Sequence, residues 1–173
     1  KAKVFNDVAD SVSGSDLVII SSPLSSYKEI LLSIKSTLKK DVILTDTGSA
    51  KKEINKIINN FNLDQVHWIS SHPIAGTEFS GPESGFAELF KDRWCILSSE
   101  NQKETQKFNL LKKFWEALGS KVKFMSFDDH DYVLSITSHL PHAIAYSIIR
   151  TVIKNEDKFK EEIIQYSASG LRD

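Results

Sequence analysis

The sequence contains a single cysteine, Cys95, and no G-x-G-x-x-G run. One cysteine excludes an internal disulfide and any zinc site built from several cysteines. Basic and acidic side chains nearly balance, at 22 and 23, and the formal net charge is -1, so no broad electrostatic footprint for nucleic acid or anionic lipid exists. No apolar run approaches the ~18 residues of a membrane span. We therefore expect a cytoplasmic protein that binds neither nucleic acid nor membrane.

What the sequence does contain is a regular alternation of apolar strands and amphipathic helices. The expected strands are at residues 16–23, 41–48, 66–70, 94–97 and 122–125. Between them, apolar residues recur every three or four positions at 27–38, 49–61 and 102–118, as in helices with one buried face. Strands that alternate with helices across short connections predict a parallel α/β sheet with right-handed crossovers.

The pattern changes after Ser126, where the strands stop. A long helix is expected over 128–154 and a second helix over 158–168. We therefore expect two domains, a sheet domain over residues 1–127 and a helical domain over residues 128–173.

A dinucleotide-binding domain carries a G-x-G-x-x-G run in the turn after its first strand, where the pyrophosphate approaches the backbone. This chain has no such run, so we expect its strands to be the later ones of a Rossmann-type domain. The first βαβ unit would then lie upstream of Lys1. The chain also opens without Met and stops at Asp173 without a helix-ending signal, so we expect it to be part of a longer protein.

Three of the expected strands carry polar residues at their ends, at Ser21-Ser22-Pro23, Thr45 to Ser49, and Ser71-His72-Pro73. Ligands of open α/β sheets bind just beyond the carboxyl ends of the strands. Small hydroxyl side chains let a flat cofactor lie close to the backbone. Gly48-Ser49 also stands at an expected helix start, where backbone N–H groups favour an anion. Any one run is equally well explained as a strand end or helix cap, but three in succession favour a ligand site.

His72 is the candidate acid–base residue at the third of these strand ends. A histidine exchanges a proton near neutral pH, which suits the oxidation of an alcohol. Most isolated histidines are structural, but this one ends a strand and precedes a loop rich in Gly, Ser and Pro, from Ala75 to about Gly85. That position favours a catalytic role.

The expected long helix carries a second group of polar residues, namely His130, Asp131, Ser138, His139 and His142. Ser138 and His142 are four residues apart and so share a helix face. Pro141 lacks an amide hydrogen and crowds the carbonyl of Thr137, which predicts a kink beside them. Zinc is an alternative ligand for these histidines, but no H-E-x-x-H pattern and no cysteine cluster supports it, so no metal is expected.

Three segments together resemble the prephenate/arogenate dehydrogenase family: Thr45 to Lys51, Ser71 to Gly81, and His130-Asp131 followed by Ser138 to Ala143. The resemblance implies a Rossmann-type domain that holds NAD or NADP. It also implies the beginning of an all-α domain that closes the active site and supplies the contacts of a homodimer. The implied reaction is an oxidative decarboxylation in tyrosine biosynthesis with hydride transfer to NAD or NADP. Prephenate would give 4-hydroxyphenylpyruvate, or arogenate would give tyrosine.

The resemblance also implies roles for individual residues. His72 would accept the proton of the ring hydroxyl while hydride leaves the same carbon, and Ser49 would be a second catalytic residue, bound to that hydroxyl. The implied substrate-binding residues are Thr77, Glu78, Ser138, His139, His142 and Arg172. The implied cofactor-binding residues are Ser21, Ser22, Pro23, Thr47, Gly48 and Ser49.

Two other interpretations stay open. The chain could be a β-hydroxyacid dehydrogenase of the 3-hydroxyisobutyrate or 6-phosphogluconate type, which would use a lysine rather than His72 as its main acid and base. It could also be a non-catalytic dinucleotide-binding or dimerisation module.

Overall fold

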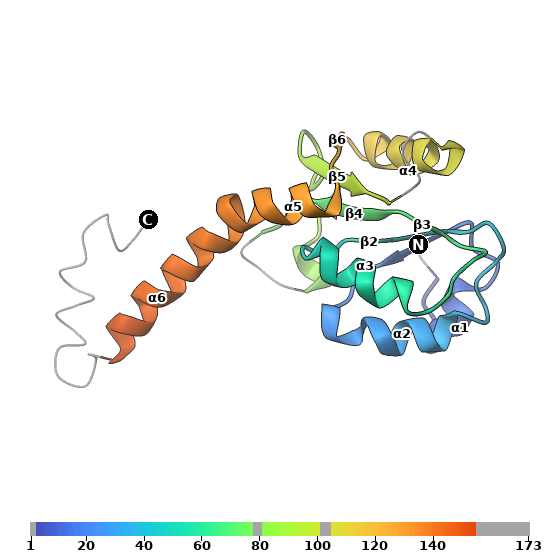
Figure 1. The fold of residues 1–173 in the computed structure, drawn as a ribbon, viewed down its shortest axis with the longest axis horizontal. Helices are drawn as coiled ribbons and strands as arrows, with labels where there is room; N and C mark the ends of the chain where they lie inside the picture. Colours follow the sequence, from blue (N-terminus) through green and yellow to red (C-terminus); the bar gives the residue numbers. More distant parts are fainter. Residues whose placement is uncertain (1–2, 78–80, 101–104, 155–173) are drawn as a thin grey trace. The chain divides into compact units, whose positions relative to one another are not determined.

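The computed structural model describes residues 3–77, 81–100 and 105–154. The chain divides into two compact units, Lys1–Asp131 and Tyr132–Asp173 (Figure 1). The helix expected over 158–168 lies outside the described residues, as do Glu78 and Arg172. The domain boundary expected near residue 127 stays a prediction.

Six strands of the first unit form two three-stranded sheets, in the orders β1-β2-β3 and β4-β5-β6. The strands are β1 (Leu17–Ile20), β2 (Ile43–Asp46), β3 (His67–Trp68), β4 (Ser70–Pro73), β5 (Trp94–Ser98) and β6 (Lys121–Phe124). Only Ile69 separates β3 from β4, and its N–H donates to the carbonyl of Leu44 in β2 over 3.1 Å. The segment from β3 to β4 therefore joins the two sheets.

The parallel pairing expected from the sequence is confirmed for β1 with β2, β2 with β3, and β5 with β6. The expectation was wrong for β5, which pairs antiparallel with β4. The described part of the connection between them contains a single short turn of 3-10 helix, η2 (Pro82–Ser84). Parallel neighbours need a crossover, usually a helix. The connection from β5 to β6 supplies one, in α4 (Gln106–Ala117).

Helices cover both faces of these strands, with α2 and α3 on one side and α4 on the other (Figure 1). α2 (Tyr27–Ile34) follows a 3-10 turn, η1 (Leu24–Ser26), and α3 is Lys51–Asn59. Their buried apolar residues lie on the faces that the sequence pattern predicted. The short α1 (Val8–Val12) was not expected, because five residues are too few to show a helical period.

α4 begins and ends on recognisable signals. The hydroxyl of Thr105 accepts from the N–H of Phe108 over 3.2 Å and caps its start. Gly119 follows its end at φ +93°, a conformation that glycine adopts without strain, which confirms the expected stop.

The long helix expected over 128–154 is present as α5 (Phe127–Leu134), a π-helical segment η3 (Ser135–His139) and α6 (Leu140–Lys154). Ser126 caps its start, because its Oγ accepts from the N–H of Asp129 over 3.0 Å and donates to Asp129 Oδ2 over 2.7 Å. The kink expected at Pro141 stays a prediction. The helix is π-helical just before it, in η3, where the N–H of Leu140 bonds the carbonyl of Ser135. Within the described residues, no helix has both the length and the apolar character of a membrane span.

Candidate active site

A cavity of about 320 Å³ lies beyond the carboxyl ends of β1 and β2. Because Ile20 and Asp46 are opposite each other in the parallel register, the residues that follow the two strands converge. The cavity is lined by Ser21, Ser22, Pro23, Leu24, Tyr27, Thr47, Gly48, Ser49, Ala50 and Ile54. All six residues predicted to bind the cofactor are among them, so the structure brings the first two polar runs into one place.

Two details of this cavity favour a ligand. The hydroxyl oxygen of Ser22 is buried and has no hydrogen-bond partner among the described residues; buried polar atoms nearly always have one. A side chain at Gly48 would place its Cβ 2.6 Å from Cδ1 of Ile54 and 3.0 Å from Oδ2 of Asp46, so these neighbours would have to shift to admit it. These residues fit a cofactor that lies against the chain and offers a polar atom to Ser22.

A buried ion pair connects the end of β2 and the start of α3 with β4. Asp46 and Lys51 are both fully buried, and Lys51 Nζ donates to Asp46 Oδ2 over 2.7 Å. Lys51 Nζ also donates to the carbonyl of Ser71 over 2.6 Å, while Asp46 Oδ1 accepts from the Ser70 hydroxyl over 2.7 Å. Burial lowers the pKa of Lys51, and the charge of Asp46 opposes that shift. The pair thus fixes the end of β2, the start of α3 and the residues just before His72.

Ser71 is itself a structural residue. Its hydroxyl is 2.6 Å from that of Thr45 and accepts from the indole N–H of Trp115 over 3.1 Å. The residue before His72 is therefore held by both α3 and α4. The expectation that Ser71, His72 and Pro73 follow the end of a strand was wrong, because these residues lie within β4 and pair with β5.

His72 is the first member of a hydrogen-bonded chain. Its Nδ1 lies 2.8 Å from Nε2 of His130, and Nδ1 of His130 lies 2.8 Å from Oδ1 of Asp131. His72 is half-buried, whereas His130 is fully buried. Burial lowers the pKa of His130, and the neighbouring carboxylate of Asp131 opposes this shift.

Asp131 ends this chain at the start of α3. Its two carboxylate oxygens accept from the backbone N–H groups of Lys51 and Lys52, over 2.9 and 3.0 Å. Burial raises the pKa of Asp131, but bonds from the Lys52 N–H, His130 and the Lys51 N–H lower it overall. The residue before α3, Ala50, has no side chain that could cap the helix. The helix start expected to favour an anionic ligand therefore already holds a carboxylate of the protein.

For the other predicted site residues, the structure gives the element on which each lies and its exposure. Thr77 is exposed on the segment after β4. Ser138 and His139 are in η3, where Ser138 is half-buried and His139 exposed. His142 is exposed in α6, with its ring centroid 6.5 Å from that of Tyr146. These three belong to the second unit, so their meeting with His72 stays a prediction.

Asp46, Lys51, His130 and Asp131 lie in the sequence motifs, but no functional role is predicted for them from the sequence. A carboxylate at the end of a buried strand was the available signal for Asp46, because such a charge needs a partner. No three or more His, Cys, Asp or Glu side chains in the described part of the chain are grouped as a metal site would require.

Comparison with known proteins extends these findings. Residues 2–124 match the nucleotide-binding domain of prephenate dehydrogenase, and residues 126–173 match the dimerization domain of prephenate dehydrogenase. The cyclohexadienyl dehydrogenase of Zymomonas mobilis is 41% identical over 170 residues, which are 98% of this chain and 58% of that protein. The chain thus spans less than two thirds of the length of this curated relative.

Solved structures agree with the sequence matches. The crystal structure of prephenate dehydrogenase from Aquifex aeolicus has a TM-score of 0.85 and 32% identity, covering 98% of this chain and 60% of that one. A second structure of the Aquifex aeolicus enzyme, in complex with hydroxyphenyl propionate and NAD+, has a TM-score of 0.83 and 30% identity, covering 98% and 58%. The first unit carries a Rossmann-type nucleotide-binding fold, and the chain belongs to the prephenate dehydrogenase family.

Proposed function

We propose that the protein is an NAD(P)-dependent dehydrogenase that oxidatively decarboxylates prephenate to 4-hydroxyphenylpyruvate, or arogenate to tyrosine. The observation that carries this proposal is His72, a half-buried imidazole in β4, one residue before the strand ends, bonded through Nδ1 to a buried histidine. The family supports the same reaction, since both matched domains are those of prephenate dehydrogenase.

NAD or NADP would lie against the cavity at the ends of β1 and β2, where it would supply the hydride acceptor. Ser21 to Pro23 would border it on one side, and Thr47 to Ser49 on the other, because these runs line the cavity together. The unpartnered Ser22 hydroxyl offers a hydrogen bond to a polar atom of the cofactor. The Aquifex aeolicus relative was solved in complex with NAD+, which supports a nicotinamide cofactor.

His72 would act as the general base. It would accept the proton of the ring hydroxyl while hydride leaves the same carbon, and Ser49 would bond that hydroxyl from the cofactor side. The bond between the ring and its carboxylate would then break, carbon dioxide would leave, and the electron pair of that bond would complete the aromatic ring. Thr77, Ser138, His139 and His142 would contact the substrate.

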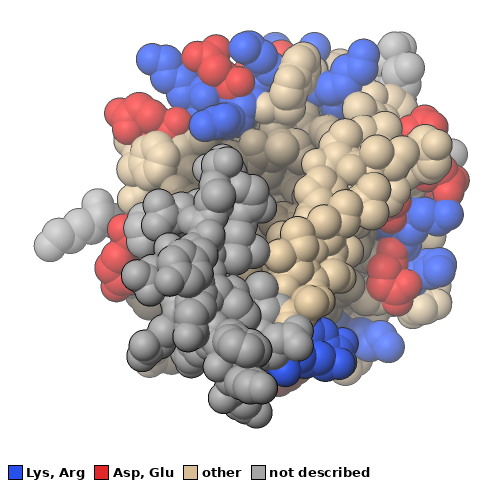
Figure 2. Space-filling view, turned by 90° about the vertical axis from the view of Figure 1, so that its left-hand side faces the viewer, with Lys and Arg blue, Asp and Glu red and all other residues tan. Residues whose placement is uncertain are grey.

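We also propose that the protein forms a homodimer through its second unit. From Tyr132 to Ile149 the chain has no Asp, Glu, Lys or Arg. Eight large apolar side chains of this stretch are exposed, by 37–74%. In the space-filling view α6 is a band of uncharged side chains with basic residues at one end (Figure 2). Exposed apolar patches of this kind mark interaction sites, and the family match describes a dimerization domain.

The experiment for the catalytic proposal is His72→Asn in the full natural protein. We expect kcat to fall by about 100-fold or more, the scale of general-base loss, with cofactor affinity almost unchanged. Turnover is followed as absorbance of reduced nicotinamide, with each substrate and each cofactor. His67→Asn is the matched control, because His67 starts β3 and pairs with Asp41 at 3.5 Å, away from the strand end.

Near-normal turnover by His72→Asn would contradict the role given to His72. Turnover of neither substrate by the unmodified protein would favour the non-catalytic module. The β-hydroxyacid dehydrogenase alternative needs a lysine as its main base. Lys51 does not suit that role, because it is fully buried and its ammonium already binds Asp46 and the carbonyl of Ser71.

A further inference from the structure

We infer, on the basis of the proposed role of His72 as a base, that His130 and Asp131 are positioning residues that fix its tautomer. They hold the proton of neutral His72 on Nδ1 and leave the lone pair on Nε2. The geometry that points to this is a continuous chain of two 2.8 Å contacts, from His72 through His130 to Asp131.

The direction of the chain follows from its carboxylate end. Asp131 accepts from two backbone N–H groups at the start of α3, over 2.9 and 3.0 Å. These bonds, with that from His130, keep the pKa of Asp131 below its ordinary value despite the opposing effect of burial, so it is ionised near neutral pH. An ionised carboxylate only accepts hydrogen bonds. Nδ1 of His130 must therefore carry the proton in its contact with Asp131.

The charge of His130 decides the next contact. It is fully buried, and the charged groups that act on it are Asp131, Lys51 and Asp46. Burial lowers its pKa, so it is neutral at physiological pH. A neutral imidazole with its proton on Nδ1 has its lone pair on Nε2. That atom must accept from His72, so Nδ1 of His72 carries a proton and Nε2 of His72 is the basic nitrogen.

The same elements also position the backbone of His72. Lys51 donates its backbone N–H to Asp131 and its ammonium to the carbonyl of Ser71, directly before His72. Ring and backbone of His72 are therefore both fixed relative to the start of α3. A misdirected tautomer would turn a proton, instead of a lone pair, toward the substrate hydroxyl.

Two substitutions at His130 separate positioning from packing. His130→Leu fills the site but accepts no hydrogen bond. His130→Gln restores both contacts, since its carbonyl oxygen accepts from His72 and its amide donates to Asp131. In the full natural protein we expect His130→Leu to lower kcat by about 10- to 100-fold, less than the ~10⁴ seen when a catalytic triad loses its orienting carboxylate. His130→Gln should recover most of that loss, and the KM for the cofactor should change little in either variant.

Nitrogen NMR of the His72 imidazole, in ¹⁵N-labelled protein without substrate, reads the tautomer directly. We expect a proton on Nδ1 in the unmodified protein and in His130→Gln, and loss of that preference in His130→Leu. A proton on Nε2 in the unmodified protein would overturn the inference, and so would equal kcat values for the Leu and Gln variants. Because the NMR measurement needs no turnover, it decides the tautomer even if the proposed reaction fails.

Discussion

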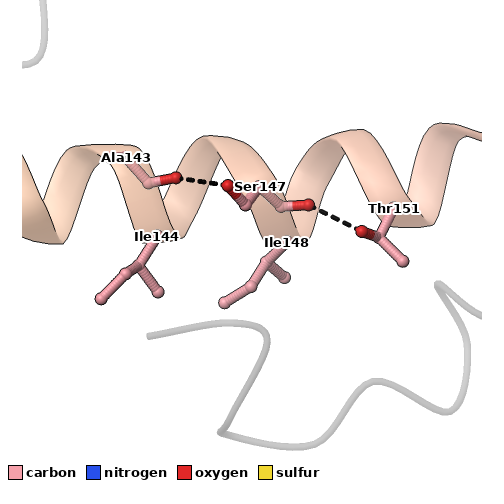
Figure 3. A pocket seen from close by; sticks show the side chains of 5 residues that line it. All are labelled: Ala143, Ile144, Ser147, Ile148 and Thr151. Carbon is pink, nitrogen blue, oxygen red and sulfur yellow. Dashed lines mark hydrogen bonds between the residues drawn. The ribbon is translucent and has the colours of Figure 1, made fainter.

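The two compact units differ in what they bury. In the first unit, charged and polar side chains are fully buried, among them Asp46, Lys51 and His130. Asp46 and Lys51 bond each other, and His130 bonds His72 and Asp131. In the second unit the reverse holds for the described residues, because Leu134 is the buried apolar residue among exposed ones. α6 also borders a hollow of about 480 Å³, into which Ile144 and Ile148 project side by side (Figure 3).

The buried polar groups of the first unit and the exposed apolar side chains of the second have different consequences. Buried polar groups are costly unless they find partners, so the bonds of Lys51 to Asp46 and Ser71 favour one arrangement of β2, α3 and β4 beside His72. Exposed apolar side chains fix nothing within their own unit, but they favour association with another surface. The first unit therefore holds the candidate active site, and the second offers the surface proposed for dimerisation.

The largest effect on stability should come from breaking the buried ion pair. Lys51→Met leaves the carboxylate of Asp46 buried without its counter-charge, so we expect the free energy of unfolding to fall by about 3–5 kcal/mol in urea titrations. Lys52→Met is the matched control. Lys52 is the next residue on α3, but its ammonium is about half exposed and pairs with the exposed Asp128, so the unfolding midpoint should stay where it is. Equal losses in both variants would contradict the special role of the buried pair.

A smaller effect on stability is expected at Gly48, where a Cβ would crowd the neighbouring side chains. A methyl group at Gly48 would stand 2.6 Å from Ile54 and 3.0 Å from Asp46, so Gly48→Ala overpacks the wall of the cavity. We expect a loss of about 1–3 kcal/mol in stability, the usual cost of overpacking, together with weaker NAD(P) binding in fluorescence titrations. Gly76→Ala is the control, because a Cβ there meets nothing within 4 Å. Unchanged cofactor affinity in Gly48→Ala would argue against a cofactor in this cavity.

The ends of β1 and β2 could be found from the sequence, because the residues that follow neighbouring parallel strands lie at the same edge of the sheet. Ser21 to Pro23 and Thr47 to Ser49 needed only two buried strands in adjacent positions, which apolar runs reveal. The pairing of β5 could not be found this way. Its apolar run is the same for a parallel or an antiparallel strand, and the connection decides the direction.

The polar network around His72 depends on contacts that no local pattern encodes. His72 and His130 are 58 residues apart, and Asp131 reaches Lys51 across 80. A Lys or an Asp normally indicates an exposed position, so the complete burial of Lys51 and Asp46 appears only once the strand, the helix and their partners are assembled.

The smallest effect on the folding of the first unit, yet a decisive one for association, is expected in α6. Ile144 is 52% exposed and lines the hollow in Figure 3, so Ile144→Lys should change the free energy of unfolding of the first unit by no more than about 0.5 kcal/mol. If α6 lies in a dimer interface, the buried lysine carries an unpaired charge, and the dimer should dissociate. Sedimentation velocity of the full natural protein measures this. Lys154→Ala, at the end of α6, is the control and should leave the dimer intact. An Ile144→Lys variant that sediments with its parent would place the dimer contacts elsewhere, and the exposed apolar face of α6 would then need another partner.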